Sequence, residues 1–515
     1  MEPQPASHSR RLVQAATLVM TFFVISKVLG LVRDIIITQH FGTSREYDAY
    51  LAAFRIPDLI FNLIAGGALG SAFIPPFAAL LARSDEEEAW RLASRVMTLV
   101  ALSVAVVIIG AEVFAEPLVA HTVAIGFSPE DQQLTAHLMR IMLVTPFLFA
   151  ISGIVTGILN SYHHFLLPSV APVLYNLGII GGAVLLAPAY GAYGLAVGVA
   201  AGAGMHFLVQ LPFLARRRFR FTPGLGLADA GVRSVLRLMA PRTLGIAAVQ
   251  VNFLINTILA STLPEGRLAA FNIAFMLILL PEGVIAQSIA TVLFPTLSQL
   301  AARGELDGLK HAFSAAFRIV LFLTIPSSVG LILLRTQIVQ VLYQRGAFTA
   351  DSTFQTAFAL QFFAIGLFAH SGLEIITRTF YALHDTATPV KIGLASFALN
   401  IALSLLLIGP LAQGGLALAN SIATILEMLT TLYLLRRKTG GLDGRQILSS
   451  LVKIGLGSAA MAAALLYFVC AAGRLNILFL AATGIALGGM VFLVVTLLLR
   501  SDELALAWRM ARPRS

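Results

Sequence analysis

Long apolar stretches, each of about 20 residues or more, follow one another along the whole chain and are separated by short polar loops. Stretches of this length can cross a lipid bilayer as α-helices. The pattern therefore predicts an all-α polytopic membrane protein with about fourteen transmembrane helices. Their expected centres lie near residues 26, 65, 106, 147, 177, 203, 247, 284, 323, 366, 398, 424, 460 and 487.

The first predicted helix differs from most others because polar residues interrupt it. Ser26, Lys27, Arg33 and Asp34 stand inside an apolar run that extends from about residue 12 to residue 41. A charged side chain at the middle of a bilayer costs about 2.5–3.5 kcal/mol on insertion scales, so such residues normally face a bundle interior or a wet cavity. We expect a polar ligand to bind there.

The second predicted helix carries a matching polar stripe. Asp48, Arg55, Asp58 and Asn62 follow one another at intervals of seven, three and four residues, which places them on one helical face. Two hydrophobic helices would thus turn polar stripes toward one space.

An alternative interpretation is that these charges only neutralise one another. Arg55 and Asp58 are spaced for a local ion pair. The three cations of the two helices also have three acids to balance them: Lys27, Arg33 and Arg55 against Asp34, Asp48 and Asp58. We favour ligand binding, because an internal ion pair could be replaced by apolar residues without loss of stability.

The composition supports the membrane interpretation and excludes other classes. Of the 515 residues, 58% are hydrophobic and only 12% are charged, about half the charged fraction of a soluble domain. The net charge of +10 could indicate nucleic acid, but Lys and Arg collect in alternate loops, which indicates anionic lipid headgroups and places both termini in the cytoplasm. The single cysteine excludes an internal disulfide and a cysteine metal cluster, and we expect no metal site.

A weak internal repeat divides the chain. Leu51–Phe54, Phe73–Pro75 and His163 recur at an offset of about 220 residues, as Leu268–Phe271, Leu293–Pro295 and His384. We therefore expect two pseudo-symmetric six-helix lobes that share an orientation, with a binding space between them. The predicted domains are residues 1–222 (helices 1–6), 223–440 (helices 7–12), and 441–515 (two extra helices and a basic tail).

The second predicted lobe carries fewer charges. Glu374 and Arg378 stand four residues apart in the favourable acid-first order. A structural ion pair and a contact with the ligand explain them equally well.

Two segments resemble the signature stretches of one family, the MurJ (MviN) lipid II flippases of the MOP exporter superfamily. They are Ser26–Asp34, continued by Phe41-Gly42 and Asp48-Ala49, and Phe380–Lys391. The resemblance covers essentially the whole chain, including the two extra helices. It implies a cationic central cavity, alternating access, and a groove formed with the last two helices for an undecaprenyl tail.

Single positions follow from the resemblance. It places Ser26, Arg33, Asp34 and Asp48 in the cavity wall, and it puts Lys27 where the family usually has arginine, so that the charge stays but the bidentate phosphate fork is lost. Two further family arginines fall at about Phe61 and Met276. The acid-rich sodium site of some members maps to Asn256, Asn400 and Ser404, which are weak candidates for an ion site.

The resemblance and the charges together predict a transporter rather than an enzyme. It would move lipid II, the undecaprenyl-diphosphate-linked peptidoglycan precursor, from the inner to the outer leaflet of the bacterial cytoplasmic membrane. Lys27, Arg33 and Arg55 would hold the diphosphate. The supporting residues of the cavity would be Ser26, Asp34, Asp48, Asp58, Asn62, Glu374 and Arg378.

No cofactor is expected, because the chain lacks a nucleotide-binding loop. Energy would then come from the membrane potential or from a monovalent ion gradient. The expected partners are the lipid-linked precursor, membrane lipids and the cell-wall synthesis machinery, and nothing requires more than a monomer. Two alternative hypotheses remain: an exporter of another polyprenyl-linked sugar or amphiphile, and a non-transporting cell-envelope scaffold.

Overall fold

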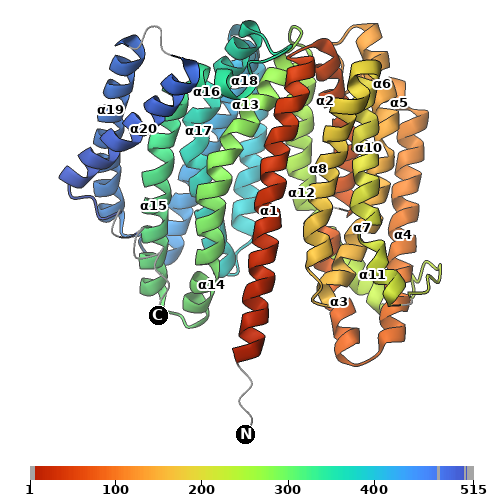
Figure 1. Cartoon of the computed structure of the whole chain (residues 1–515). Coiled ribbons are helices and arrows are strands. Elements are labelled where there is room, and N and C mark those ends of the chain that lie inside the picture. Colours follow the sequence, from red (N-terminus) through yellow and green to blue (C-terminus); the bar gives the residue numbers. More distant parts are fainter. Residues whose placement is uncertain (1–5, 66, 218, 472–475, 504–505, 507–515) are drawn as a thin grey trace. The chain divides into compact units, whose positions relative to one another are not determined.

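All regular secondary structure in the described part of the chain is helical. The computed structural model describes residues 6–65, 67–217, 219–471, 476–503 and 506, and within them it contains helices and no strands (Figure 1). The predicted all-α class is confirmed. The predicted basic tail lies almost wholly outside the described residues.

The chain forms two compact units, residues 1–266 and 267–515. This division differs from the predicted boundaries at residues 222 and 440, which follow the sequence repeat and stay a prediction. The difference arises because the helix Ala230–Ser261 packs against helices of the first unit.

The first unit consists of long helices interrupted by short π-helical turns. Its elements are α1 (Ala6–Phe41), α2 (Arg45–Ile60), η1 (Phe61–Ala65), α3 (Gly67–Ala82), α4 (Glu86–Val113), α5 (Ala115–His121), α6 (Pro129–Met142), α7 (Val144–Ser161), α8 (Leu166–Gly181), η2 (Gly182–Leu186), α9 (Ala187–Tyr190), α10 (Ala192–Leu208), α11 (Leu211–Arg216) and α12 (Ala230–Ser261).

The second unit is built in the same way. Its elements are α13 (Arg267–Glu282), η3 (Gly283–Gln287), α14 (Ser288–Ala302), α15 (Leu306–Leu333), α16 (Arg335–Tyr343), α17 (Ala350–Ala382), α18 (Ala387–Thr439), α19 (Gly444–Ala471) and α20 (Ile477–Leu498).

The helices supply the predicted number of membrane passages. Ten helical segments of the described chain are long and apolar enough to cross a membrane. One of them, α18, turns back at Ala412, where φ is 46°, so it holds two passages. The more polar α1, the run α2–η1–α3, and α12 bring the described total to about fourteen.

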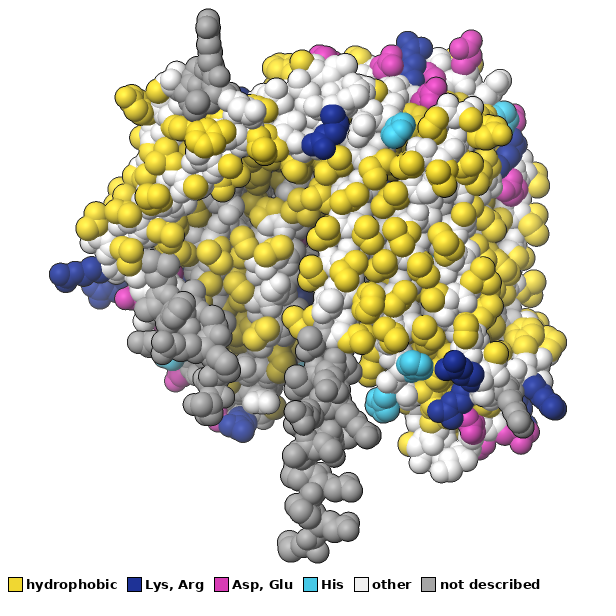
Figure 2. All heavy atoms as spheres, viewed as in Figure 1, with side chains coloured by type: hydrophobic (Ala, Val, Ile, Leu, Met, Phe, Trp, Pro, Cys, Tyr) yellow, Lys and Arg dark blue, Asp and Glu magenta, His cyan; other side chains and the backbone are white. Residues whose placement is uncertain are grey.

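The surface of the first unit has the pattern of a membrane protein. Figure 2 shows hydrophobic side chains over the middle of its visible face, whereas Lys, Arg, Asp and Glu side chains gather toward the two ends of the helices. Side chains that face acyl chains need no polar partner, and charged ones are stable only near the headgroups.

Backbone conformations repeat between the two units. Each unit has an interrupted second passage and single residues with positive φ at an offset of about 220 residues. The matching pairs are η1 with η3, Ser84 with Gly304, His163 with His384, and Gly191 with Ala412. Turns and interruptions at equivalent points support the predicted internal duplication.

Polar side chains fix the starts of several helices. An N-cap side chain accepts a hydrogen bond from a backbone N–H group that has no partner within the helix. This holds for Ser44, Asp85, Ser128, Asp229, Thr349 and Asn476.

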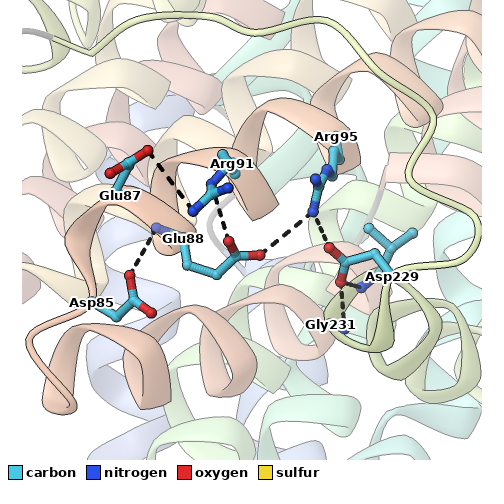
Figure 3. A network of polar contacts seen from close by, with 8 residues as sticks. Asp85, Glu87, Glu88, Arg91, Arg95, Asp229 and Gly231 are labelled. Carbon is cyan, nitrogen blue, oxygen red and sulfur yellow. Dashed lines mark hydrogen bonds and ion pairs between the residues drawn. The ribbon is translucent and has the colours of Figure 1, made fainter.

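The Asp229 cap also connects α12 to α4. Its carboxylate accepts a hydrogen bond of 2.6 Å from the Gly231 backbone and forms an ion pair with Arg95 (Figure 3). Arg95 also forms an ion pair with Glu88. This network holds the start of α12 beside the start of α4, within the first unit.

Glycines allow α8 and its continuation η2 to approach α10 very closely. A Cβ atom at Gly182 would lie 2.6 Å from the backbone of Gly194 and of Gly198. By contrast, a Cβ atom at the adjacent Gly181 would have no atom within 4 Å. Small residues at a helix crossing permit this approach.

We expect Gly182→Ala to lower the stability of the first unit by about 1–3 kcal/mol, because backbone atoms rather than flexible side chains would have to move. Gly181→Ala is the matched control and should cause little change. Thermal loss of the helical circular-dichroism signal in detergent measures both variants. Equal melting temperatures would contradict the proposed contact between the two helices.

The second unit attaches its last helices through a mixed apolar and polar contact. Phe322 of α15 packs on Phe492 of α20, with 4.9 Å between the ring centroids. Arg318 of α15 forms an ion pair of 3.3 Å with Glu503, a residue that also accepts a hydrogen bond from Ser450 of α19. Both members of the ion pair are buried, so the segment directly after α20 is anchored to α15.

Candidate functional site

The centre of the predicted site is the neighbouring pair Arg33 and Asp34 on α1. The Nη2 atom of Arg33 lies 2.8 Å from the Oδ1 atom of Asp34, and Nε lies 2.9 Å from the same atom. The side chains are 21% and 13% exposed. The acid therefore satisfies only one edge of the guanidinium and leaves donors for other partners.

Asn176 of α8 connects this pair to Ser26. Its Oδ1 atom accepts a hydrogen bond of 3.1 Å from Arg33, and its Nδ2 atom donates one of 3.3 Å to the Ser26 hydroxyl. Ser26 and Arg33 are seven residues apart, so they share one face of α1. Asn176 thus fixes the direction in which that polar face points.

Lys27 borders a cavity of about 650 Å³ between α1, the end of α7 and the start of α8. The Lys27 side chain is exposed, and its ammonium lies 5.4 Å from the centre of the Phe23 ring. The walls are mostly apolar, with a few polar groups. They comprise Val19, Phe22, Phe23, Ser26, Lys27, Asn160, Phe165, Pro168, Ser169 and Pro172.

Arg55 of α2 turns toward α12. Its Nε atom donates a hydrogen bond of 2.9 Å to the Thr257 hydroxyl, and its guanidinium lies 5.6 Å from the centre of the Phe253 ring. The side chain is therefore oriented by a helix about 200 residues away in the chain.

Asp58, one turn beyond Arg55, is held by amide groups. It accepts hydrogen bonds of 2.9 Å from Asn62 and of 3.2 Å from Gln250. Arg55 and Asp58 also attract each other electrostatically. Asp58 thus connects α2 to α12, in addition to its predicted interaction with Arg55.

Two tyrosines, Tyr50 of α2 and Tyr175 of α8, lie near the charged groups of α1 and α2. Both are close to Arg33, and Tyr175 is also close to Asp58. The prediction from sequence had missed both tyrosines, together with Asn176, Gln250 and Thr257. The signal that could have found the amides is that polar residues inside apolar helices usually face the protein interior.

Asp48 is deeply buried at the start of α2, at 3% exposure. Its Oδ2 atom accepts a hydrogen bond of 2.6 Å from the backbone N–H group of Gly266. Gly266 has a φ of 79°, a conformation that glycine adopts readily. Asp48 therefore holds the loop that closes the first unit.

The positions that depart from the family pattern hold apolar side chains. Phe61 begins η1 and packs on the Phe149 ring at 5.2 Å between centroids. Met276 is exposed on α13. Neither position can supply a positive charge.

In the second unit, Glu374 and Arg378 form the predicted ion pair on α17, at 3.3 Å. Arg378 also donates a hydrogen bond of 3.2 Å to the Thr291 hydroxyl of α14. The local pair is therefore present, and contact with a ligand stays a prediction.

The candidate ion positions lie in both units. Asn256 is on α12 of the first unit and donates a hydrogen bond of 3.0 Å to the Asn252 carbonyl. Asn400 and Ser404 are buried on α18 of the second unit. Groups of three or more potential metal ligands among His, Cys, Asp and Glu are absent from the described residues. The ion site stays a prediction.

The second signature segment forms a loop that holds two helices together. Asp385 accepts hydrogen bonds from the Thr388 backbone at 3.0 Å and from the Thr388 hydroxyl at 2.9 Å. Lys438, from the far end of α18, also donates to it, and this hydrogen bond lowers the pKa of Asp385 to about 2. These contacts connect the loop before α18 to the last turns of α18.

Comparisons with known proteins place the chain in a family. The sequence model described as "Lipid II flippase MurJ" matches residues 37–497. The chain belongs to the MurJ family. This confirms the resemblance seen in the signature segments.

Relatives and solved structures agree with this assignment. The lipid II flippase MurJ of Burkholderia cenocepacia is 32% identical, over 83% of this chain and 84% of its own length. The probable lipid II flippase MurJ of Vibrio cholerae is 30% identical, over 87% and 89%. A solved structure, "Lipid II flippase MurJ, inward closed conformation", matches with a TM-score of 0.82 and 26% identity, over 95% of this chain and all of that chain.

More distant structures share the fold alone. An inward-facing multidrug transporter of the MATE family, in the MOP superfamily, has a TM-score of 0.68 at 14% identity and covers 83% of this chain. Members of the MurJ family are transporters rather than enzymes.

Proposed function

We propose that this protein flips lipid II from the inner to the outer leaflet of the cytoplasmic membrane by alternating access. The family assignment supports the cargo and the reaction. The observation that carries the proposal is the arrangement on α1, where Arg33 is oriented by Asp34 and Asn176 on the helix whose Lys27 borders a cavity.

The chemistry of the cargo explains this arrangement. A diphosphate loses its hydration in a low-dielectric membrane, and fixed cations with free N–H donors can replace the lost water. Lys27, Arg33 and Arg55 would supply the positive charge. The neighbouring Asp34 and Asp58 would weaken each grip enough to allow release.

The cavity beside Lys27 has the mixed character that such a cargo needs. Its phenylalanine and proline side chains suit a polyprenyl chain or the apolar part of a headgroup, whereas Ser26, Lys27 and Asn160 can bind phosphate or sugar oxygens. We infer that this cavity receives the cargo first.

Further features of the proposal follow from the sequence. The basic loops support a cytoplasmic position for both termini. The protein would act as a monomer, with membrane lipids and the cell-wall synthesis machinery as its partners. The driving force would be the membrane potential or a monovalent ion gradient, because the chain has no nucleotide-binding loop.

A second cargo class is favoured by two positions alone. Phe61 and Met276 replace arginines of the family, and fewer cations would suit another polyprenyl-linked sugar. Complementation separates these possibilities. A bacterial strain depleted of its own lipid II flippase should grow when it produces this protein, and failure to grow despite normal membrane expression would contradict lipid II as the cargo.

Arg55 and Asp58 provide a test of direct cargo contact. We expect Arg55→Ala to reduce complementation more than Asp58→Ala, because only the arginine would bind phosphate. Growth of the depleted strain at matched expression levels measures both. Equal losses of growth would show that the two residues act only as a structural pair that contacts α12.

A further inference from the structure

Glu282, at the end of α13, is a buried acid that the proposed cargo site does not use. Its side chain is 8% exposed, and its Oε2 atom has no hydrogen-bond partner among the described residues. An isolated carboxylate in this environment is very costly, so such a group normally takes a partner or a proton.

A second acid makes the ionised form of Glu282 less favourable. Glu282 interacts repulsively with Glu374 of α17. Glu374 in turn is paired with Arg378, so one cation serves two acids. Two carboxyl groups that share a site do not both ionise readily, and one of them then retains a proton.

Tyr381 of α17 lies near both Glu374 and Arg378, and the other ionisable groups described next have partners elsewhere. On α18, Glu427 interacts with His370 of α17. On α15, Arg318 pairs with Glu503, and on α13 itself Arg267 donates to Gln413. The helix α14 contributes no ionisable side chain. Arg378 is therefore the cation that is paired directly with one of the two acids.

The position of Glu282 also links it to a bend. Pro281 removes a backbone donor, and η3 begins directly after Glu282. The first unit has the same order, with Pro57 and Asp58 shortly before η1. Prolines and π-helical turns are common causes of helix bending, and π-helical turns within α-helices are frequent at functional sites.

Asp58 and Glu282, the acids before these two bends, differ in their hydrogen bonds. Asp58 is satisfied by two amide groups, whereas the Glu282 Oε2 atom is not. We propose that Glu282 holds a proton, favoured by the nearby acid Glu374, and that its uptake and release accompany each transport cycle by changing the bend at η3. The coupling of the proton to the transport cycle rests on the proposed flippase function, whereas the proton site itself does not.

Infrared spectroscopy of the full chain in liposomes without lipid II tests the proton site. We expect a C=O stretching band of a neutral carboxylic acid at neutral pH, which disappears in Glu282→Gln. The matched control is Glu305→Gln, which alters an exposed acid of the same unit and should keep the band. A second variant, Glu374→Gln, should shift the band, because it removes the neighbouring acid that favours the protonated form of Glu282.

Transport of lipid II in the same liposomes tests the coupling. A gradient of one pH unit, acid on the outer side, should speed outward flipping by the wild type by up to about tenfold if one proton enters per lipid. Glu282→Gln should flip at a rate that does not respond to the gradient.

The outcomes separate the two proposals. A neutral-acid band that persists in Glu282→Gln would overturn the proton site. Absence of the band from the wild type would also overturn it, and is the result expected if a metal cation occupies the site instead of a proton. Equal responses of wild type and Glu282→Gln to the gradient would overturn the coupling. A protein that keeps the band but moves no lipid II would contradict the flippase function and leave the proton site intact.

Discussion

Arg33→Ala is expected to abolish growth of a strain depleted of its own lipid II flippase, although the variant reaches the membrane. The substitution removes the cation proposed to bind the diphosphate. It also leaves Asp34 without its ion-pair partner, and the loss should stay below the value of about 3–5 kcal/mol for a fully buried pair because both side chains are only partly buried. The single variant alone therefore cannot separate lost binding from lost stability.

The double variant Arg33→Ala/Asp34→Ala separates them. It removes both charges, so no uncompensated acid remains in the membrane, and stability should largely return. If Arg33 binds cargo, the double variant should still fail to support growth. Growth of the double variant at the wild-type rate would show that the two residues only neutralise each other.

The second large effect is expected at the end of the chain. Arg318→Ala should lower the free energy of unfolding of the second unit by about 3–5 kcal/mol, because Glu503 would become a buried acid without its cation. Thermal loss of helical circular dichroism in detergent measures this loss. The attachment of α19 to α15 should weaken with it.

Two controls define the cause of that loss. Arg318→Met combined with Glu503→Met replaces the pair by apolar side chains and should recover most of the stability. Arg303→Ala breaks the exposed contact with Glu305 and should change little. A melting temperature unchanged in Arg318→Ala would refute the anchoring role of this ion pair.

Most of the fold could be predicted because its causes are local in sequence. Apolar runs of bilayer length predict helices directly, and the two runs centred near residues 398 and 424 correspond to the two parts of α18 on either side of the turn at Ala412. The pair Glu374 and Arg378 was predictable for the same reason, since residues four apart on a helix are neighbours. The internal repeat was visible in a few sequence matches at an offset of about 220 residues. Positive φ angles at equivalent turns of the two units support it.

The partners of the site residues were less predictable because they come from distant helices. Local spacing indicated a pair between Arg55 and Asp58, but Thr257 and Gln250 on α12 supply the hydrogen bonds. Asn176 orients Arg33 from α8. Nothing in the sequence near Glu282 signals its lack of a partner, which depends on how α13 and α17 pack.

The central claim is that fixed cations of the first unit recognise a diphosphate. Flipping of lipid II by the purified protein in liposomes, with Lys27 and Arg33 both replaced by Gln, tests it most directly. We expect the wild type to flip lipid II and to be inhibited by undecaprenyl diphosphate but not by undecaprenol, and the double variant to be inactive. Flipping by the double variant at the wild-type rate would contradict the claim.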